Sequence, residues 1–365
     1  MWYNSVDKSE TMARSNNYLG IDFGAGGIKV LNVALEKKKA KLVTYGFTER
    51  SPEEAENDWF TDPQATANLL KKICAKAHTT TTQVITALPI ASVFSAVINL
   101  PAAASKEVAS AVRWEAKKLI PLPLEEVVLD WKLLPPAAGP RNSAAGQEKV
   151  KEKDKTIEVL LTGAPKTLIN KYLDVFKKAG LNLLSLETEA FAFVRSLIGN
   201  DPSPTAIVDI GARKSNILIL DRGVPFLTRS IDIGGKNFTQ NIAAKLNIPT
   251  DQAEELKRNM SETELSGGIP DMIKEVLTPL LNEMKYSLDT YRARNNMTRS
   301  IEKIILTGGG AMLPKLTDYF TEFFNLRTFL GDPWVRLNYP EELKPVLQNI
   351  GSRFSVAIGL ALREI

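Results

Sequence analysis

The stretch NYLGIDFGAGGIKVLNVAL, residues 17–35, decides the fold class of this chain. It reads as an apolar strand that reaches Asp22, a turn crowded with glycines, and a second apolar strand that carries Lys29. A tight glycine-bearing hairpin directs successive backbone N–H groups outward, and such a nest binds phosphate oxygens without help from side chains. Lys29 can neutralise phosphate as a point charge. The stretch therefore predicts a backbone phosphate site beside Asp22.

A second copy of this pattern occurs at TAIVDIGARKSNILILDRG, residues 205–223. Both copies have an aspartate, one intervening residue and a glycine: Asp22 with Gly24, and Asp209 with Gly211. An internal strand-turn-strand repeat indicates two related lobes. Two nests that face each other across a cleft can hold one polyphosphate, and aspartates beside phosphate require a cation between them. Mg²⁺, which usually keeps several of its waters, suits that arrangement.

Three further segments have the composition of nucleotide contacts. ILTGGGAMLPKL, residues 305–316, follows an apolar strand, and its consecutive glycines allow the backbone to approach a base and sugar. Gly234 and Gly235 precede a helix whose first N–H groups are predicted to receive phosphate. Glu254 and Lys257 share one helix face, where the carboxylate can accept from ribose and the lysine stem can pack on a base. Singly, such patterns are more often turns or solvated ion pairs; their ordered occurrence favours a nucleotide site.

Composition narrows the function classes. The chain has 365 residues, 44% of them hydrophobic, which is typical of a globular protein large enough for two lobes. Lys and Arg exceed Asp and Glu by 46 − 42 = 4, too little for a dedicated nucleic-acid binder. The single cysteine, Cys74, excludes an internal disulfide framework and a thiolate zinc cluster. No window supplies the roughly 20 apolar residues of a membrane span, so we expect a cytoplasmic chain that reaches a membrane only through a partner.

Strand patterns alternate with helical patterns along the chain, which favours an α/β architecture. The expected organisation is a flexible segment 1–16, a first lobe over 17–83, 183–204 and 339–365, a second lobe over 205–338, and a small αβ insertion over 84–182. Within the insertion, the polar segment 136–155 is predicted to be an exposed mobile loop. Trp114 and Trp131 are expected in the core of the insertion.

These motifs resemble the conserved segments of the actin-like ATPase superfamily. IDFGAGGIK resembles phosphate segment one, VDIGARKSN phosphate segment two and LTGGGAML the adenosine segment. Over nearly the whole chain the resemblance is to the PilM branch, a relative of FtsA, and includes EAKKLIPLPLEEVVLDWKLL, FKKAGLNLLSLETEAFAFVRSL and NEMKYSLDTY. The resemblance implies an α/β, actin-like (ribonuclease H-like) bilobal ATPase fold, with two related lobes around an ATP cleft and a small αβ insertion subdomain.

The resemblance also implies a ligand and its contacts. ATP with Mg²⁺ is the expected ligand, and Asp22 and Asp209 are expected to hold the metal through water. The expected nucleotide contacts are Asp22, Gly24, Ala25, Gly26, Gly27, Lys29, Asp209, Gly211, Ser215, Asn216, Gly234, Gly235, Lys236, Asn237, Glu254, Lys257, Gly308, Gly309, Gly310 and Met312. Because Ala25 and Gly27 carry no hydroxyl groups, phosphate contact at the first turn is expected through the backbone.

By the same resemblance, the chain binds the N-terminal cytoplasmic tail of a PilN-type inner-membrane protein in a groove beside the insertion. This contact is expected to link the tail to the pilus assembly motor ATPase, at the cytoplasmic side of the inner membrane. No nucleic-acid partner is expected, and self-association stays open.

Hydrolysis is expected to be slow or absent. Ala192 stands where actins carry a water-orienting glutamine, and an attacking water requires a polar group within hydrogen-bond reach. Glu187 and Glu189 are near in sequence, but the sequence does not fix their direction. Two alternatives remain on the same fold: a kinase for a sugar or acid, and a filament-forming division protein of the FtsA type.

Overall fold

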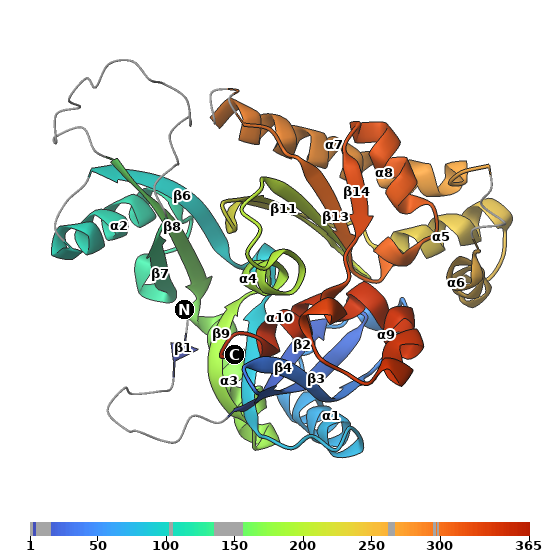
Figure 1. Ribbon diagram of the computed structural model, residues 1–365, viewed down its shortest axis with the longest axis horizontal. Helices are drawn as coiled ribbons and strands as arrows, with labels where there is room; N and C mark the ends of the chain where they lie inside the picture. The colour runs from blue at the N-terminus through green and yellow to red at the C-terminus, as the bar shows by residue number, and fades with distance from the viewer. Residues whose placement is uncertain are drawn as a thin grey trace.

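The computed structural model describes residues 3–4, 16–101, 105–134, 156–261, 267–294, 297 and 299–365. These residues form two α/β lobes and a smaller insertion, each built around its own sheet (Figure 1). An apolar cluster joins the lobes: it includes Ile85 and Phe193 from the first lobe with Ile207 and Leu218 from the second. The predicted bilobal α/β arrangement is confirmed.

The first lobe contains a six-stranded sheet in the order β1-β9-β5-β2-β3-β4. Its strands are β1 (Tyr3–Asn4), β2 (Asn17–Gly24), β3 (Gly27–Glu36), β4 (Lys39–Phe47), β5 (Gln83–Leu88) and β9 (Asn182–Thr188). One face is covered by α1 (Pro63–Lys76) and α3 (Lys166–Ala179). The other face is covered by α10 (Ser355–Ala361). Successive residues of a strand point to opposite faces, so in β3 Val30 packs with α1 and α3, and Leu31 packs with α10.

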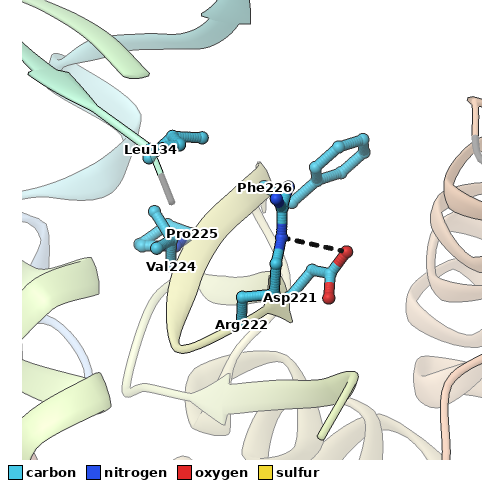
Figure 2. A pocket seen from close by; sticks show the side chains of 6 residues that line it. All are labelled: Leu134, Asp221, Arg222, Val224, Pro225 and Phe226. Atoms are coloured by element: carbon cyan, nitrogen blue, oxygen red, sulfur yellow. Dashed lines mark ion pairs between the residues drawn. The ribbon is translucent and has the colours of Figure 1, made fainter. Parts of the chain in front are cut away.

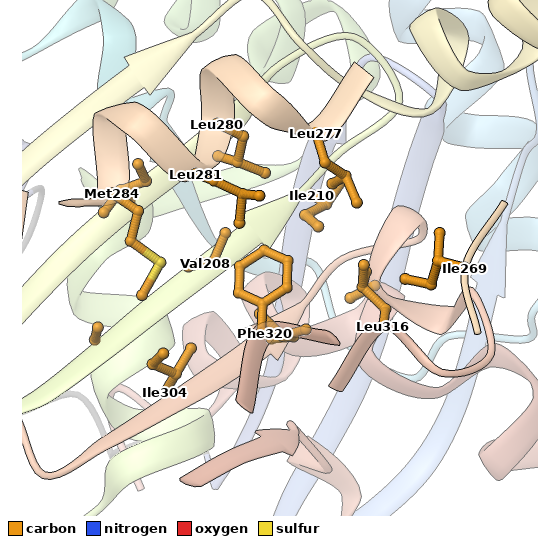
Figure 3. Close-up of a cluster of buried hydrophobic side chains, with 14 of the residues drawn as sticks. Val208, Ile210, Ile269, Leu277, Leu280, Leu281, Met284, Ile304, Leu316 and Phe320 are labelled. Carbon is orange, nitrogen blue, oxygen red and sulfur yellow. The ribbon is translucent and has the colours of Figure 1, made fainter. Parts of the chain in front are cut away.

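The second lobe contains a five-stranded sheet in the order β12-β11-β10-β13-β14. Its strands are β10 (Thr205–Ile210), β11 (Ser215–Asp221), β12 (Val224–Ile231), β13 (Lys303–Thr307) and β14 (Arg327–Leu330). Its helices are α5 (Gly235–Leu246), α6 (Thr250–Asn259), α7 (Asp271–Arg294) and α8 (Leu316–Phe324). Figure 3 shows side chains of α7, including Leu277 and Met284, packed over Val208 and Phe320 in the core of this lobe.

The two lobes repeat one pattern of strand pairing, which confirms the predicted duplication. In the first lobe β2, β3 and β4 are antiparallel, and β5 and β9 are added in parallel. In the second lobe β10, β11 and β12 are antiparallel, and β13 and β14 are added in parallel. Asp22 lies opposite Lys29 in one hairpin, and Asp209 lies opposite Asn216 in the other. The pairing of β3 with β4 shifts register after Asn32, and the pairing of β11 with β12 shifts register after Ile219. Along the sequence, these two positions are equally far from Asp22 and Asp209.

The insertion is smaller than the range 84–182 that the sequence predicts. Its sheet has the order β6-β8-β7 and consists of β6 (Phe94–Pro101), β7 (Val127–Leu133) and β8 (Thr156–Pro165), covered by α2 (Ser105–Leu119). At the ends of the predicted range, β5 pairs with β2 and α3 packs in the core of the first lobe. The boundary was wrong because strand pairing is a long-range choice that local patterns do not encode.

Two other predicted segments fall partly or wholly outside the described residues. The predicted mobile loop 136–155 lies outside them. Of the predicted flexible segment 1–16, Tyr3–Asn4 instead forms β1, which pairs antiparallel with β9. The edge of a sheet offers unpaired backbone groups, which explains how so short a segment is held there.

Two more helices complete the connection between the lobes. α4 (Glu189–Phe193) follows β9 and continues as a π-helical turn over Val194–Ile198. α9 (Lys344–Ile350) precedes α10 near the end of the chain. β9 belongs to the same sheet as the β2–β3 hairpin and ends at Thr188, so the first residue of α4, Glu189, lies at the edge of that sheet.

Candidate nucleotide-binding site

The first hairpin closes with Gly24 opposite Gly27, so that only Ala25 and Gly26 form the turn. Gly27 has φ +144°, and a Cβ atom there would overlap the backbone carbonyl oxygen of Thr48. No other residue fits this position without moving the chain. On the strands below, Lys29 Nζ lies 3.2 Å from Asp22 Oδ2, and both side chains are largely buried. The first hairpin is therefore rigid, and its aspartate has a cationic partner.

The second hairpin has the same length but different side-chain chemistry. The Gly211 N–H donates to the Lys214 carbonyl at 2.9 Å, and Asn216 Nδ2 donates to Asp209 Oδ2 at 3.1 Å. Asp209 thus has an amide where Asp22 has an ammonium group. The fully buried Ser215 donates its hydroxyl to the Ile233 carbonyl at 2.6 Å, so its hydroxyl hydrogen is used within the second lobe.

The two turns face each other at the junction of the lobes. A Cβ atom on Gly26 would lie 3.0 Å from the Cβ of Ala212. The segment after β4 crosses the same junction: Glu56 forms ion pairs with Lys236 and with Arg213 of the second lobe. The structure therefore brings together the two glycine turns that the sequence predicts to bind one polyphosphate.

The helix α5 does not offer its first N–H groups to a ligand, contrary to prediction. The Gly235 N–H donates to the Gly211 carbonyl at 2.9 Å, and the Lys236 N–H donates to the Ala212 carbonyl at 2.8 Å. The Gly234 N–H donates to Asn237 Oδ1 at 2.9 Å. The Gly235 and Lys236 N–H groups thus satisfy two carbonyls of the second turn. Residues 234–237 therefore hold the second turn in place.

The glycine segment after β13, which resembles an adenosine segment, lies directly against Asp209. Gly308 has φ +85°, and a Cβ atom there would lie 2.5 Å from Asp209 Oδ1 and from the Ile210 carbonyl. Gly310–Met312 forms a short 3₁₀ turn, and the Met312 sulfur lies near Gly351. The glycines after β13 thus allow close approach to the second aspartate, as well as to any ligand in front of it.

Glu254 and Lys257 bind each other on α6. Lys257 Nζ lies 2.6 Å from Glu254 Oε2, and it also donates to the Thr239 hydroxyl at 2.8 Å and to the Gly235 carbonyl at 3.1 Å. Burial alone raises the pKa of Glu254, but hydrogen bonds from Lys257, Thr239 and Arg258 outweigh it and lower that pKa. The predicted pair is therefore present and partly buried beside α5.

Glu189 is the site residue that sequence reasoning left unassigned. It is the first residue of α4, and its Oε2 accepts from the Ile90 N–H at 3.0 Å. Burial, with repulsion from Asp22 and Asp209, raises its pKa to about 8. Ala192, which the sequence placed at the water-orienting position, is fully buried in the apolar cluster between the lobes. A helix begins at Glu189, so this side chain lies near Asp22 and Asp209, whereas Ala192 lies in the core.

Three carboxyl groups concentrate charge at this junction. Burial raises the pKa of Asp209 to about 7, with a further contribution from repulsion by Asp22, against the hydrogen bond from Asn216. A cation between the carboxylates would relieve this repulsion. Within the described residues, no group of three or more His, Cys, Asp or Glu side chains is arranged to hold a metal ion. The donor set fits Mg²⁺ held through water and phosphate, since that ion usually has few protein ligands.

Two lobes with one strand order, each presenting an aspartate and a glycine turn to the other, define this protein as a member of the actin-like ATPase fold class. A family model described as "Type IV pilus assembly protein PilM" matches residues 20–365. The chain belongs to that family.

Solved structures agree with this assignment. The chain is similar to the solved "PilM-PilN type IV pilus biogenesis complex", with a TM-score of 0.78, 28% identity, and coverage of 95% of this chain and 98% of that chain. It shares its fold with the ethanolamine utilization protein EutJ from Carboxydothermus hydrogenoformans, with a TM-score of 0.54, 16% identity, and coverage of 95% and 89%.

Curated relatives match a part of the chain. The cell division protein FtsA of Bacillus subtilis is 24% identical over 229 residues, which are 55% of this chain and 50% of FtsA. FtsA of Borreliella burgdorferi is 26% identical over 179 residues, 42% and 41% of the two chains. The chain thus spans about half the length, or less, of these relatives. None of the helices in the described part of the chain is long and apolar enough to cross a membrane.

Proposed function

We propose that this chain binds ATP with Mg²⁺ between its two glycine hairpins and acts as a nucleotide-dependent adaptor in type IV pilus assembly. The observation that carries the nucleotide assignment is the approach of Gly26 to Ala212 beside the carboxyl groups of Asp22, Asp209 and Glu189. When bound, Mg²⁺ would neutralise phosphate and carboxylate charge together. Asp22 and Asp209 would hold it through water.

The phosphate contacts would come from the backbone of the two turns. Ala25 and Gly26 form the first turn and Ala212 and Arg213 the second, and none of these side chains competes as a hydroxyl donor. Lys29, already beside Asp22, would divide its charge between that carboxylate and a phosphate oxygen. The α6 pair and the 308–312 segment would border the adenosine.

Hydrolysis would be slow and would depend on Glu189. One oxygen of this carboxyl already accepts from Ile90, so only the other is open to a water. Glu189→Gln keeps the shape and the acceptor while removing the basic group. We expect this variant to bind ATP as the parent does and to lose the residual turnover; an unchanged turnover would show that another group positions the water.

The partner is the N-terminal cytoplasmic tail of a PilN-type inner-membrane protein, which we place at the seam between the insertion and the lobes. A depression there is lined by Ile90, Val93, Ser95, Leu160, Thr162, Thr188, Ala190, Phe191, Pro225 and Thr228. Its mixture of apolar groups and hydroxyls suits an extended peptide. Both β6 and β12 are edge strands of their sheets, so each can add a strand.

At one end of this seam, Leu134 of the insertion lies beside Val224 and Pro225 of the second lobe (Figure 2). Arg222 Nη2 lies 2.6 Å from Glu158 Oε2 on β8, which ties the β11–β12 turn to the insertion. The seam therefore contains residues of both lobes and of the insertion. A change in the relative position of the lobes would alter the site at which the tail binds. The tail would hold the protein at the inner membrane, where it would contact the assembly motor.

Isothermal titration with ATP–Mg²⁺ and with a PilN-type tail peptide tests both parts of this proposal. We expect saturable binding of each and little turnover. Thr228→Trp, which fills the depression, should abolish peptide binding and preserve ATP binding, whereas Thr278→Trp on the exposed face of α7 should change neither. Phosphoryl transfer to a sugar or acid, or peptide binding unaffected by Thr228→Trp, would overturn the corresponding part.

A further inference from the structure

The insertion helix α2 has an outer face that folding does not explain. Its inner face packs Val108, Val112 and Ala116 on the three-stranded sheet, which satisfies the apolar requirement of the helix. On the outer side, Trp114 is 65% exposed. The sequence predicted this tryptophan in the core, so that prediction is wrong. A large aromatic side chain in water, away from any core, indicates a surface that contacts something else.

Cations surround this tryptophan. Arg113, Lys117 and Lys118 are exposed and lie on the same side of α2, because residues three and four positions apart are neighbours on a helix. Lys118 Nζ lies 5.4 Å from the centre of the Trp114 ring and 2.7 Å from Glu115 Oε1. The C-terminal half of this face therefore combines an aromatic ring with a net positive charge.

One leucine extends the apolar part of the patch. Leu122 follows α2 and is 42% exposed, whereas Leu119 lies about two turns after Val112 and therefore on the inner side of the helix. Figure 1 shows α2 on the outer side of the insertion, with β6 and β8 between it and the second lobe. We call Arg113, Trp114, Lys117, Lys118 and Leu122 the α2 patch. Among the described residues, the side chains of this patch are exposed.

We propose that the α2 patch binds the surface of an anionic lipid bilayer. Lysine and arginine attract anionic headgroups, tryptophan prefers the boundary between headgroups and acyl chains, and leucine enters that boundary. A convex helix face suits a fluid headgroup layer, which adapts to it, whereas an acidic protein would need a groove of matching shape. This contact is direct and separate from attachment through a membrane-protein tail, and it would orient the insertion toward the bilayer.

Flotation of the full chain with vesicles tests the proposal. Vesicles of phosphatidylcholine with phosphatidylglycerol should carry the protein upward, and vesicles of phosphatidylcholine alone should not. The double variant K117E/K118E should bind the anionic vesicles at least about 25-fold more weakly than the parent, since each surface cation contributes roughly five-fold to the affinity. K71E/K72E, the same charge reversal at exposed lysines of α1, is the matched control and should bind as the parent does.

Brominated lipids, which quench nearby tryptophan, report the position of Trp114. Quenching should occur with the parent and disappear in Trp114→Phe. Failure to bind anionic vesicles, equal binding of the two double variants, or binding of soluble polyglutamate in preference to vesicles would overturn the proposal. Because these vesicles contain no peptide, such a failure would leave the ATP and tail titrations unaffected.

Discussion

The two hairpins share one backbone plan, and they differ in how each aspartate is neutralised. In the first, Asp22 lies opposite Lys29; in the second, Asp209 lies opposite Asn216. The segment after the third strand supports each turn: the Arg50 N–H donates to the Gly26 carbonyl in one lobe, and the Gly235 N–H donates to the Gly211 carbonyl in the other. The backbone conformation of the turn is thus the same in both lobes, whereas the residue that faces the aspartate is charged in one lobe and neutral in the other.

Because their aspartates are neutralised differently, the two hairpins are expected to contribute differently to ligand binding. The first hairpin is neutral and tightly packed before any ligand arrives, so its contribution is a fixed shape. The second carries a carboxyl whose pKa burial raises to about 7, so its charge is costly until a cation approaches. Ligand binding is therefore expected to act mainly through the second hairpin.

The largest effect is expected from Gly27→Ala. Its Cβ would overlap the Thr48 carbonyl at a backbone angle that alanine disfavours, so we expect a loss of about 3 kcal/mol in the free energy of unfolding. Urea denaturation measures it. Lys214→Ala, at the equivalent position of the second hairpin, removes an exposed ion pair with Asp232 and should leave the free energy of unfolding nearly unchanged. Equal losses would show that the two turns are packed alike.

Asn substitutions at the two aspartates should change stability in opposite directions at about pH 8 without ligand. Asp22→Asn leaves the buried Lys29 without its ion-pair partner and should destabilise the protein by about 2 kcal/mol. Asp209→Asn removes a carboxyl that is costly to ionise and keeps an acceptor for Asn216, so it should stabilise by about 1 kcal/mol. Both should weaken ATP–Mg²⁺ binding. The same sign for both stability changes would contradict the comparison.

The pH dependence of stability follows from the raised carboxyl pKa values. The native protein retains protons on Glu189 and Asp209 up to about pH 8 and 7, whereas the unfolded chain releases them near its ordinary pKa values. Stability without ligand should therefore fall as pH rises from about 5 to 8, by about 1 kcal/mol or more. Asp209→Asn and Glu189→Gln should each flatten this slope. Calorimetry in buffers of different ionisation enthalpy should detect proton release when ATP–Mg²⁺ binds at neutral pH.

The smallest effect concerns the ion pairs that support the first hairpin from outside. Glu49 follows Thr48 and binds Arg353 at 2.7 Å and Arg258 of α6 at 3.2 Å. Glu49→Gln should lower the free energy of unfolding by about 0.5 kcal/mol, because these side chains are largely solvated. The difference from the parent should vanish at about 1 M salt, where such pairs are screened. A difference that persists there would assign Glu49 a packing role.

The sequence by itself determined the repeated elements of this protein. Alternating apolar residues, an aspartate and a glycine turn occur twice, and these short-range patterns predicted two related lobes and the residues of both turns. The choice of glycine at Gly27 is local in the same sense, since it is set by the backbone angle of one turn. The family resemblance followed from these motifs and is confirmed.

Only the tertiary structure decided where side chains from distant segments meet. Glu189 becomes a site residue because β9 pairs with β5 and a helix begins at its end. The first N–H groups of α5 are consumed because the second turn presents carbonyls to them. Long-range strand pairing also places β5, and with it α3, in the first lobe and not in the insertion. Trp114 is exposed because it lies on the outward side of α2. Periodicity encodes which residues share a face, but burial of a face depends on which other segment the chain brings against it.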